Sequence, residues 1–352
     1  MSTNIITLAN EKGGVGKTFL AVQLALYAAQ QFKLKTLVID LDSQGNASSI
    51  LKKNDQVLVA DGITSADLFS KDCSITADDK EHALVLVSAP ASGHELQSIA
   101  QSNDEVQKDM LLNFYNLVSA EAGKFDLVII DTNPNADLRS TCAIACSTHV
   151  LCPIQLYQES IDGINGMCER ILGGNDKVNM FLIPSMLESN SYQMKNADVL
   201  IQYLSHMLLP VTEYVIQKEE GEDGAKLQIT PKEMFAAIKR RSAFAEAQGS
   251  GKPIQQVPNS ERAWKELKRV FFSICATLDV DREDAMTVEQ KAAVKKLAET
   301  YPEQWQTLLK QYWMSNSRAD LACIDKVTSC DLAALKTTCS KPFVRNLDYL
   351  LQ

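Results

Sequence analysis

Short, continuous apolar runs alternate with longer amphipathic segments through the first half of the chain. Such runs are typical of strands buried on both faces of a parallel sheet, and helix-like stretches separate them. We predict six strands of this kind, at Asn4–Ala9, Thr36–Asp40, Ala83–Ser88, Phe125–Asp131, His149–Ile154 and Val178–Ile183. Strands joined by helical crossovers predict an α/β fold, with a mostly parallel sheet flanked by helices.

The chain beyond residue 184 is mainly helical in pattern. Its amphipathic segments predict helices over Ala197–Leu209, Lys232–Gln248 and Ser260–Leu278. Pro231 suits the first turn of the second of these helices. The polar, glycine-containing stretch 218–226 predicts an exposed loop, and it follows a candidate short strand at Tyr214–Gln217.

We expect two domains, a larger α/β domain over residues 1–280 and a small helical C-terminal appendage over residues 281–352, in which no convincing strand is found. The composition, with 45% hydrophobic and 22% charged residues, is that of a globular protein. A net charge of −9 argues against a wholly basic nucleic-acid binder. The apolar runs are far shorter than the roughly 18–20 residues that a membrane span needs. We therefore expect a cytoplasmic protein without stable membrane insertion.

A glycine-rich segment, Lys12-Gly-Gly-Val-Gly-Lys-Thr18, lies between the first predicted strand and a long predicted helix over Lys17–Phe32. Glycines allow successive backbone N–H groups to point at phosphate oxygens, and the helix N-terminus adds partial positive charge. The pattern predicts an ATP-binding loop in which Lys17 contacts the β- and γ-phosphates and Thr18 binds Mg²⁺. The other expected nucleotide-binding residues of this loop are Lys12, Gly13, Gly14, Val15, Gly16 and Phe19.

This loop departs from the ordinary P-loop at two positions. Glu11 stands where the first glycine is usual, and a second lysine, Lys12, precedes Gly13. In this the chain resembles the deviant Walker A ATPases of the ParA/MinD group. The resemblance implies a P-loop NTPase fold and an ATP-dependent homodimer, in which Lys12 of one subunit reaches the nucleotide held by the other.

Two carboxylates extend the resemblance. Asp42 lies in Leu37–Asn46, which is similar to the family's D-x-D-P-Q-G-N segment with Ser43 in place of proline. Asp131 ends a strand similar to the family's Walker B, in which Asn133 replaces the first proline of D-T-P-P. The resemblance implies that Asp42 positions the attacking water, and that Asp131 holds Mg²⁺ together with Thr18 and Asp42. With Lys12 and Lys17, Asp42 completes the expected catalytic set. A helix N-cap is the alternative interpretation of Asp42.

Similarity to ParA proteins continues downstream, so that the family pattern covers about residues 3–278. Val150–Gln155 is similar to the ParA stretch V-x-V-P-x-Q, and Arg240–Pro258 to its R-x-x-x-x-x-E-A-x-x-x-G-K-P-I segment. In relatives the region that follows lies near the adenine. Pro258 and Asn259 are therefore candidates for the base pocket, with a simple turn as the alternative.

The ParA resemblance also implies binding of DNA without sequence preference in the ATP-bound dimer. Clustered cations that neutralise phosphates are the physical requirement for such binding. The candidate DNA contacts are Lys239, Arg240, Arg241, Lys252, Lys268 and Arg269. A solvated helix face is the ordinary alternative for such a run of charges.

Together these features favour a ParA-like ATPase that drives partition of a plasmid or another DNA element. The resemblance implies that a ParB-like partner stimulates hydrolysis, and that the ATP-bound dimer associates with the nucleoid. The alternative hypothesis is an ATP-gated positioning or assembly switch. Such a switch would recruit a protein complex or a membrane surface through residues 281–352.

Overall fold

The computed structural model describes residues 3–70, 73–75, 83–188, 190–221, 224–278, 295–302 and 305. The chain divides into two compact units, of which the first is drawn from Met1–Leu209 and Ala237–Trp264. The second contains Pro210–Ala236 and the chain from Lys265 onward. The expected domain boundary near residue 280 falls outside the described residues and stays a prediction.

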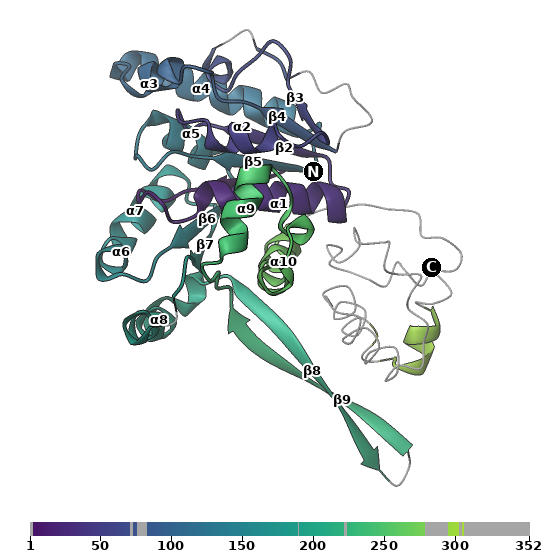
Figure 1. Cartoon of the computed structure of the whole chain (residues 1–352). Helices are drawn as coiled ribbons and strands as arrows, with labels where there is room; N and C mark the ends of the chain where they lie inside the picture. The colour runs from purple at the N-terminus through teal and green to yellow at the C-terminus, as the bar shows by residue number, and fades with distance from the viewer. Residues whose placement is uncertain are drawn as a thin grey trace. The chain divides into compact units, whose positions relative to one another are not determined.

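Seven parallel strands form the sheet of the first unit (Figure 1). Across the sheet they lie in the order β3 (Val57–Val59), β4 (Leu84–Val87), β2 (Thr36–Asp40), β5 (Leu127–Asp131), β1 (Asn4–Leu8), β6 (His149–Ile154) and β7 (Asn179–Pro184). The predicted α/β fold is confirmed, and its six predicted strands are all present. The strand order switches at β1, because the chain first builds the side of the sheet that contains β2 and then continues on the other side with β6. Such a switch leaves a crevice at the carboxyl ends of the strands.

Helices cover both faces of this sheet (Figure 1). The helices of the first unit are α1 (Lys17–Gln31), α2 (Asn46–Leu51), α3 (His94–Ala100), α4 (Asp104–Ala122), α5 (Leu138–Cys146), α6 (Gln158–Asp162), α7 (Ile164–Gly174), α8 (Ser191–Leu204) and α9 (Ser242–Ser250). Short 3-10 turns occur at Asp67–Phe69, Ser205–Met207 and Ile254–Gln256. The helix α10 (Glu261–Ala276) begins in the first unit and continues in the second.

The central strands are buried on both faces because helices pack against each side. One face carries Ile5, Leu37 and Val128, which belong to a core that includes Phe114 of α4 and Leu138 of α5. The helix α1, whose side chains are mostly buried, contacts β1, β2 and β5. This double burial explains the continuous apolar runs and holds the loops at the strand ends on a rigid base.

A long antiparallel hairpin corrects two predictions from the sequence. It consists of β8 (Pro210–Gly221) and β9 (Gly224–Phe235), with Gly221 opposite Gly224. The stretch 218–226 is thus mainly strand rather than an exposed loop. Pro231 lies inside β9, opposite Tyr214, and does not start a helix. Each strand of a two-stranded ribbon has an open edge, where a residue without an N–H is tolerated.

Two helices also differ from prediction in where they begin. The helix α8 starts at Ser191, six residues before the predicted Ala197, because Asn190 caps it by accepting a hydrogen bond from the N–H of Gln193. The helix α9 starts only at Ser242. In the C-terminal region residues 295–300 are helical, and most of the expected appendage lies outside the described residues. Among the described helices, none combines the length and apolar character of a membrane span.

Candidate functional site

The glycine-rich segment joins β1 to α1 at the carboxyl end of the sheet. Gly14 and Gly16 have φ angles of +73° and +95°, which glycine adopts without the strain of a side chain. Gly16 is the N-cap of α1 and has no side chain to occupy the first N–H groups of the helix. The helix therefore presents its N-terminal donors and partial positive charge to the space in front of the loop.

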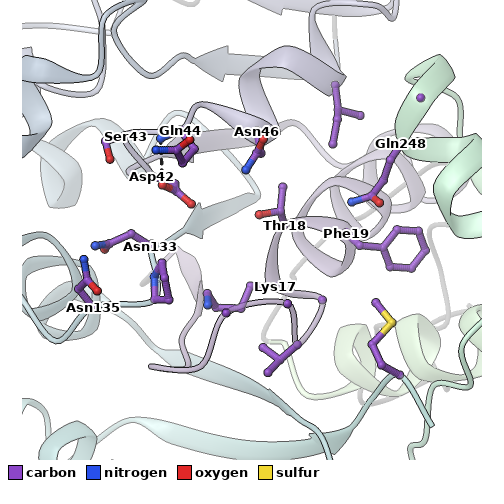
Figure 2. A pocket seen from close by; sticks show the side chains of 18 residues that line it. Lys17, Thr18, Phe19, Asp42, Ser43, Gln44, Asn46, Asn133, Asn135 and Gln248 are labelled. Atoms are coloured by element: carbon purple, nitrogen blue, oxygen red, sulfur yellow. Dashed lines mark hydrogen bonds between the residues drawn. The ribbon is translucent and has the colours of Figure 1, made fainter. Parts of the chain in front are cut away.

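A cavity of about 760 Å³ opens in front of this loop (Figure 2). It is lined by the loop residues from Gly13 to Phe19 and by segments that follow β2 and β5. Its other lining residues are Asp42, Ser43, Gln44, Asn46, Ile50, Asn133, Pro134, Asn135, Met186, Gln248 and Gly249. The fold thus brings Lys17, Thr18 and Asp42 together around one space, as the sequence predicts.

Lys17 is held at the base of this cavity. Its Nζ donates to the carbonyl oxygens of Asn10 at 2.8 Å and Lys12 at 3.3 Å. Burial lowers the pKa of Lys17, while the charges of Asp131 and Asp42 oppose that shift. An ammonium group has three donors, so a cation held on two carbonyls keeps capacity for a further acceptor. A phosphate oxygen is an acceptor that would also favour its charged form.

Asp131 ends β5 and is fully buried. Neither carboxylate oxygen has a partner with full hydrogen-bond geometry among the described residues, although the nearby Thr18 hydroxyl favours its charged form. Burial raises the pKa of Asp131 well above its usual range, and the charges of Asp40 and Asp42 add to this shift. A buried carboxylate with so few donors is rare in folded proteins, and it suits a positive ligand.

The oxygen-bearing side chains of Thr18, Asp42 and Asp131 fit a Mg²⁺ ion, which prefers oxygen ligands and keeps several waters. Asp131 is the strongest support for this assignment, because its buried carboxylate oxygens have no partner with full hydrogen-bond geometry and a cation would offset their charge. No three His, Cys, Asp or Glu side chains form a complete metal site in the described part of the chain. Phosphate oxygens and water would therefore complete the coordination.

Two aspartates in the loop after β2 have different surroundings. Asp40 is buried, and its Oδ2 accepts hydrogen bonds from the backbone N–H and the hydroxyl of Ser48 at 2.8 and 2.7 Å. Burial raises the pKa of Asp40 to about 6, although these hydrogen bonds oppose the shift. Asp42 accepts the N–H of Gln44 at 3.0 Å and lines the cavity. Because Gly45 is the N-cap of α2, Asp42 is not the helix cap that the alternative interpretation requires.

Lys12 does not line this cavity. Its Nζ lies 3.4 Å from Oε2 of Glu159 and 3.3 Å from Oγ of Ser160, and these three residues line a separate cavity of about 390 Å³. Lys12 also lies over the ring of Tyr157, 5.6 Å from its centre. The Glu159 side chain is 89% exposed, so this ion pair contributes little and is easily exchanged for another partner.

The two base-pocket candidates do not line the nucleotide cavity. Pro258 and Asn259 are both exposed, and Asn259 has a φ of +55°. Ile50, Met186 and Gln248 line the cavity instead, from segments other than the glycine-rich loop and the loops that carry Asp42 and Asn133. No pattern in the sequence points to Met186. It lies two residues beyond the end of β7, has an uncommon φ of +52° and lines the cavity.

The candidate DNA-binding residues fall into two groups. Lys239, Arg240 and Arg241 directly precede α9 and Lys252 follows it, so they flank a nine-residue helix roughly 13 Å long. Lys239 and Lys252 are exposed, and Arg240 pairs loosely with Glu188 at 3.4 Å. Lys268 and Arg269 lie on α10, in the part that belongs to the second unit.

Comparison with known proteins agrees with this site. A family model described as "AAA domain" matches residues 3–183, which include the loop, Asp42 and Asp131. Protein IncC of Escherichia coli is 25% identical over 290 residues, which are 79% of this chain and 70% of IncC. The chromosome partitioning protein ParA of Myxococcus xanthus is 31% identical over 172 residues.

The chain belongs to the ParA/MinD family of P-loop ATPases. The match to the Myxococcus ParA covers 47% of this chain and 57% of that protein. A match to the sporulation initiation inhibitor protein Soj of Bacillus subtilis has 28% identity and covers 64% of Soj. The similarity is therefore concentrated in the ATPase core, and ATP and Mg²⁺ binding are general properties of the family to which this chain belongs.

Solved structures agree with the architecture. A McdA–ATP complex from Cyanothece superposes with a TM-score of 0.56 at 16% identity, covering 81% of this chain and 99% of that one. The apo form of McdA gives a TM-score of 0.54 at 17% identity, covering 77% and 98%. At this level of identity the likeness shows the shared fold.

Proposed function

We propose that this protein is a ParA-like partition ATPase that dimerises on ATP, binds DNA without sequence preference and is released by hydrolysis. A ParB-like partner would stimulate that hydrolysis. The proposal is supported by the family membership and by relatives named as partition proteins. The observation that carries it is a cavity lined by the glycine-rich loop, Lys17, Thr18 and Asp42, together with a second lysine, Lys12, that lies outside that cavity.

The cavity residues would have different roles in ATP hydrolysis. Lys17 and the N-terminus of α1 bind phosphate oxygens, because both present positive charge to the same space. Thr18 and Asp131 would hold Mg²⁺, which, when bound, supplies charge neutralisation at the phosphates. Asp42 would orient the attacking water, since its carboxylate lines the cavity and can accept a hydrogen bond from a water O–H.

Lys12 would act on the nucleotide of a second copy of the chain. Its Nζ contacts Glu159 and Ser160 rather than the cavity of its own subunit. A cation that reaches the phosphates only after association couples dimer formation to the bound nucleotide. It also adds positive charge where the transition state of phosphoryl transfer develops negative charge. ATP would thus stabilise the dimer, and loss of the γ-phosphate would release it.

The basic residues around α9 would contact DNA in the dimer. A dimer doubles the number of cations presented to one duplex, which makes its binding stronger and more dependent on salt than that of a monomer. We expect wild-type protein to bind unrelated duplexes with ATP and to lose at least about tenfold in affinity with ADP. Replacing Lys239, Arg240 and Arg241 with glutamate should abolish the ATP-dependent binding. Fluorescence anisotropy of a labelled random duplex measures both effects.

Two controls sharpen this experiment. Replacing the exposed Lys108, Lys124 and Lys177 with glutamate makes the same change in net charge away from α9. This control variant should keep most of its ATP-dependent affinity, whereas an equal loss in both variants would contradict a local DNA surface. ATP-dependent dimerisation without DNA affinity at low salt would instead support the positioning or assembly switch.

A further inference from the structure

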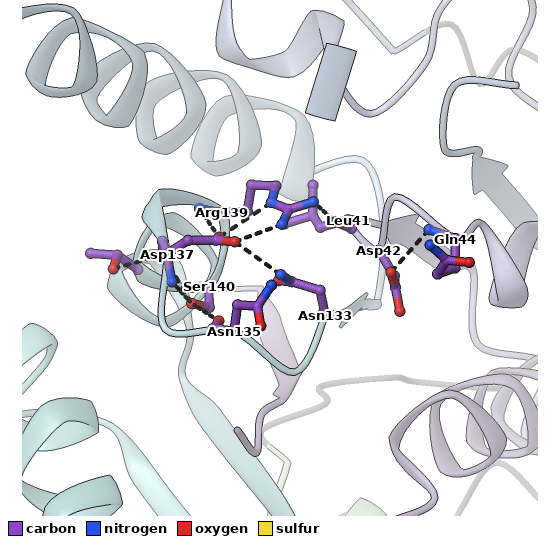
Figure 3. Close-up of polar contacts among 9 residues, drawn as sticks. Leu41, Asp42, Gln44, Asn133, Asn135, Asp137, Arg139 and Ser140 are labelled. Carbon is purple, nitrogen blue, oxygen red and sulfur yellow. Dashed lines mark hydrogen bonds and ion pairs between the residues drawn. The ribbon is translucent and has the colours of Figure 1, made fainter. Parts of the chain in front are cut away.

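A buried polar network joins the segment after β5 to the loop that carries Asp42 (Figure 3). The side chain of Asp137 is its centre. Its Oδ2 accepts hydrogen bonds from Nη2 of Arg139 at 2.6 Å and from Nδ2 of Asn133 at 2.9 Å. The guanidinium of Arg139 also donates through Nη1 to the carbonyl oxygen of Leu41 at 3.4 Å. We call the three side chains Asn133, Asp137 and Arg139 the brace.

The brace is built into the start of α5. Asp137 is the N-cap, and it accepts the backbone N–H of Arg139 while Ser140 completes a capping box. Burial alone would raise the pKa of Asp137, but the hydrogen bonds from Arg139 and Asn133 hold it below its usual value. Asp137 is therefore an acceptor, which turns the Asn133 amide nitrogen toward it. The cap fixes both ends of the ion pair to one helix.

Burial makes Arg139 more than a surface ion-pair partner. Its side chain is only 3% exposed, and that of Asp137 is 15% exposed. An arginine costs a large desolvation penalty when buried, which several well-oriented hydrogen bonds must offset. A planar guanidinium can bind a carboxylate and a separate carbonyl at once, whereas an ammonium is a single point charge. The residue type and its burial therefore match a two-sided contact.

The carbonyl that Arg139 contacts belongs to the peptide group immediately before Asp42. The N–H of that same peptide group donates to Oδ1 of Asp40 at 3.1 Å. Arg139 and Asp40 thus hold the Leu41–Asp42 peptide from its two sides. The orientation of a peptide group fixes the position of the Cα that follows it, and so limits the directions open to the next Cα–Cβ bond. The brace accordingly restricts where the carboxylate of Asp42 can lie at the cavity.

We propose that Arg139 is a positioning residue for ATP hydrolysis, which couples the nucleotide-facing segment at Asn133 to the carboxylate of Asp42 through Asp137 and Leu41. The inference rests on the proposed function, because it assumes that Asp42 orients the attacking water. Asn133 lines the cavity, so a displacement there is passed to Asp42 through the brace. Asn133 thereby gains a role at the position where the family pattern has proline.

The test compares Arg139→Lys with Asp137→Asn in the full-length protein. Arg139→Lys keeps the positive charge, but an ammonium group cannot contact both Asp137 and the carbonyl oxygen of Leu41. Asp137→Asn keeps an oxygen for capping but loses the ion pair. In each folded variant we expect kcat for ATP hydrolysis to fall by about tenfold or more, because a small misplacement of a reacting group is costly. ATP affinity should change by less than about threefold, since neither residue binds the phosphates.

Amide hydrogen exchange of residues 42–45 gives a second readout, which does not depend on hydrolysis. With the brace weakened, these amides should exchange several-fold faster in the ATP-bound protein, because the loop opens more often. Lys124→Met is the control, as it removes the ion pair with Glu121 on α4 and touches no cavity residue. The control should leave both kcat and exchange at residues 42–45 unchanged.

Three outcomes would overturn the brace. They are a kcat within twofold of wild type in both folded variants, unchanged exchange at residues 42–45, and a loss of kcat accompanied by an equal loss of ATP affinity. Wild-type protein that binds ATP without hydrolysing it would instead refute the proposed function. In that case the exchange comparison alone decides whether Arg139 holds the loop.

Discussion

Replacing Lys17 with alanine is expected to lower ATP affinity by at least about 100-fold, because a buried cation beside the phosphates contributes several kcal/mol in a partly desolvated site. In the folded protein Lys17 is held on two carbonyl oxygens at the base of the cavity. No other lining residue is a lysine or arginine in the described part of the cavity. Isothermal titration with a nonhydrolysable ATP analogue measures this loss directly.

The fold should tolerate this substitution. Burial lowers the pKa of Lys17, which means that the folded state disfavours its charge relative to solvent. Removing the ammonium therefore relieves a desolvation cost, and the midpoint of thermal unfolding should shift little. Lys124→Met again serves as the control for loss of a lysine outside the cavity. Retained ATP affinity in folded Lys17→Ala protein would show that the glycine-rich loop is not the phosphate site.

Asp42→Ala should separate hydrolysis from binding. We expect kcat to fall by about 100-fold, because the attacking water loses the carboxylate that orients it, while ATP affinity changes by less than about threefold. The variant should accumulate with unhydrolysed ATP bound. Single-turnover hydrolysis of radiolabelled ATP, together with an ATP titration, gives the two quantities separately.

A matched carboxylate is available for this experiment. Asp55 is exposed and lies outside the cavity, so Asp55→Ala makes the same change in charge without altering the site. Its hydrolysis rate should equal that of wild type. Normal turnover in Asp42→Ala would assign the aspartate to the loop structure, in which it already accepts the N–H of Gln44.

Much of the fold could be predicted because buried parallel strands leave a strong pattern. Thr36–Asp40 and His149–Ile154 were predicted at the bounds of β2 and β6, since burial on both faces demands continuous apolar residues. The strand β3 was missed, as Val57–Val59 is too short to show a period. The hairpin was missed because Pro231 favours the start of a helix when only its neighbours in sequence are considered. In the structure the pairing of β9 with β8 determines the conformation of this segment.

The candidate site divides in the same way. Residues of a contiguous motif, such as Lys17 and Thr18, were recognisable because the loop geometry requires particular residue types in sequence. Met186 and the brace arise from segments that are distant in sequence and meet only in the fold. The sequence shows that Asn133 departs from the family pattern. Its hydrogen bond to Asp137 depends on where α5 begins, which only the structure shows.

The mass of the protein in solution tests the central claim most directly, namely that ATP joins two copies through Lys12. Sedimentation with a nonhydrolysable ATP analogue should give twice the monomer mass of 38.9 kDa, and with ADP the monomer mass. Lys12→Ala should bind the analogue normally and remain a monomer. A wild-type protein that stays monomeric with saturating analogue, or a Lys12→Ala variant that dimerises as well as wild type, would contradict the account.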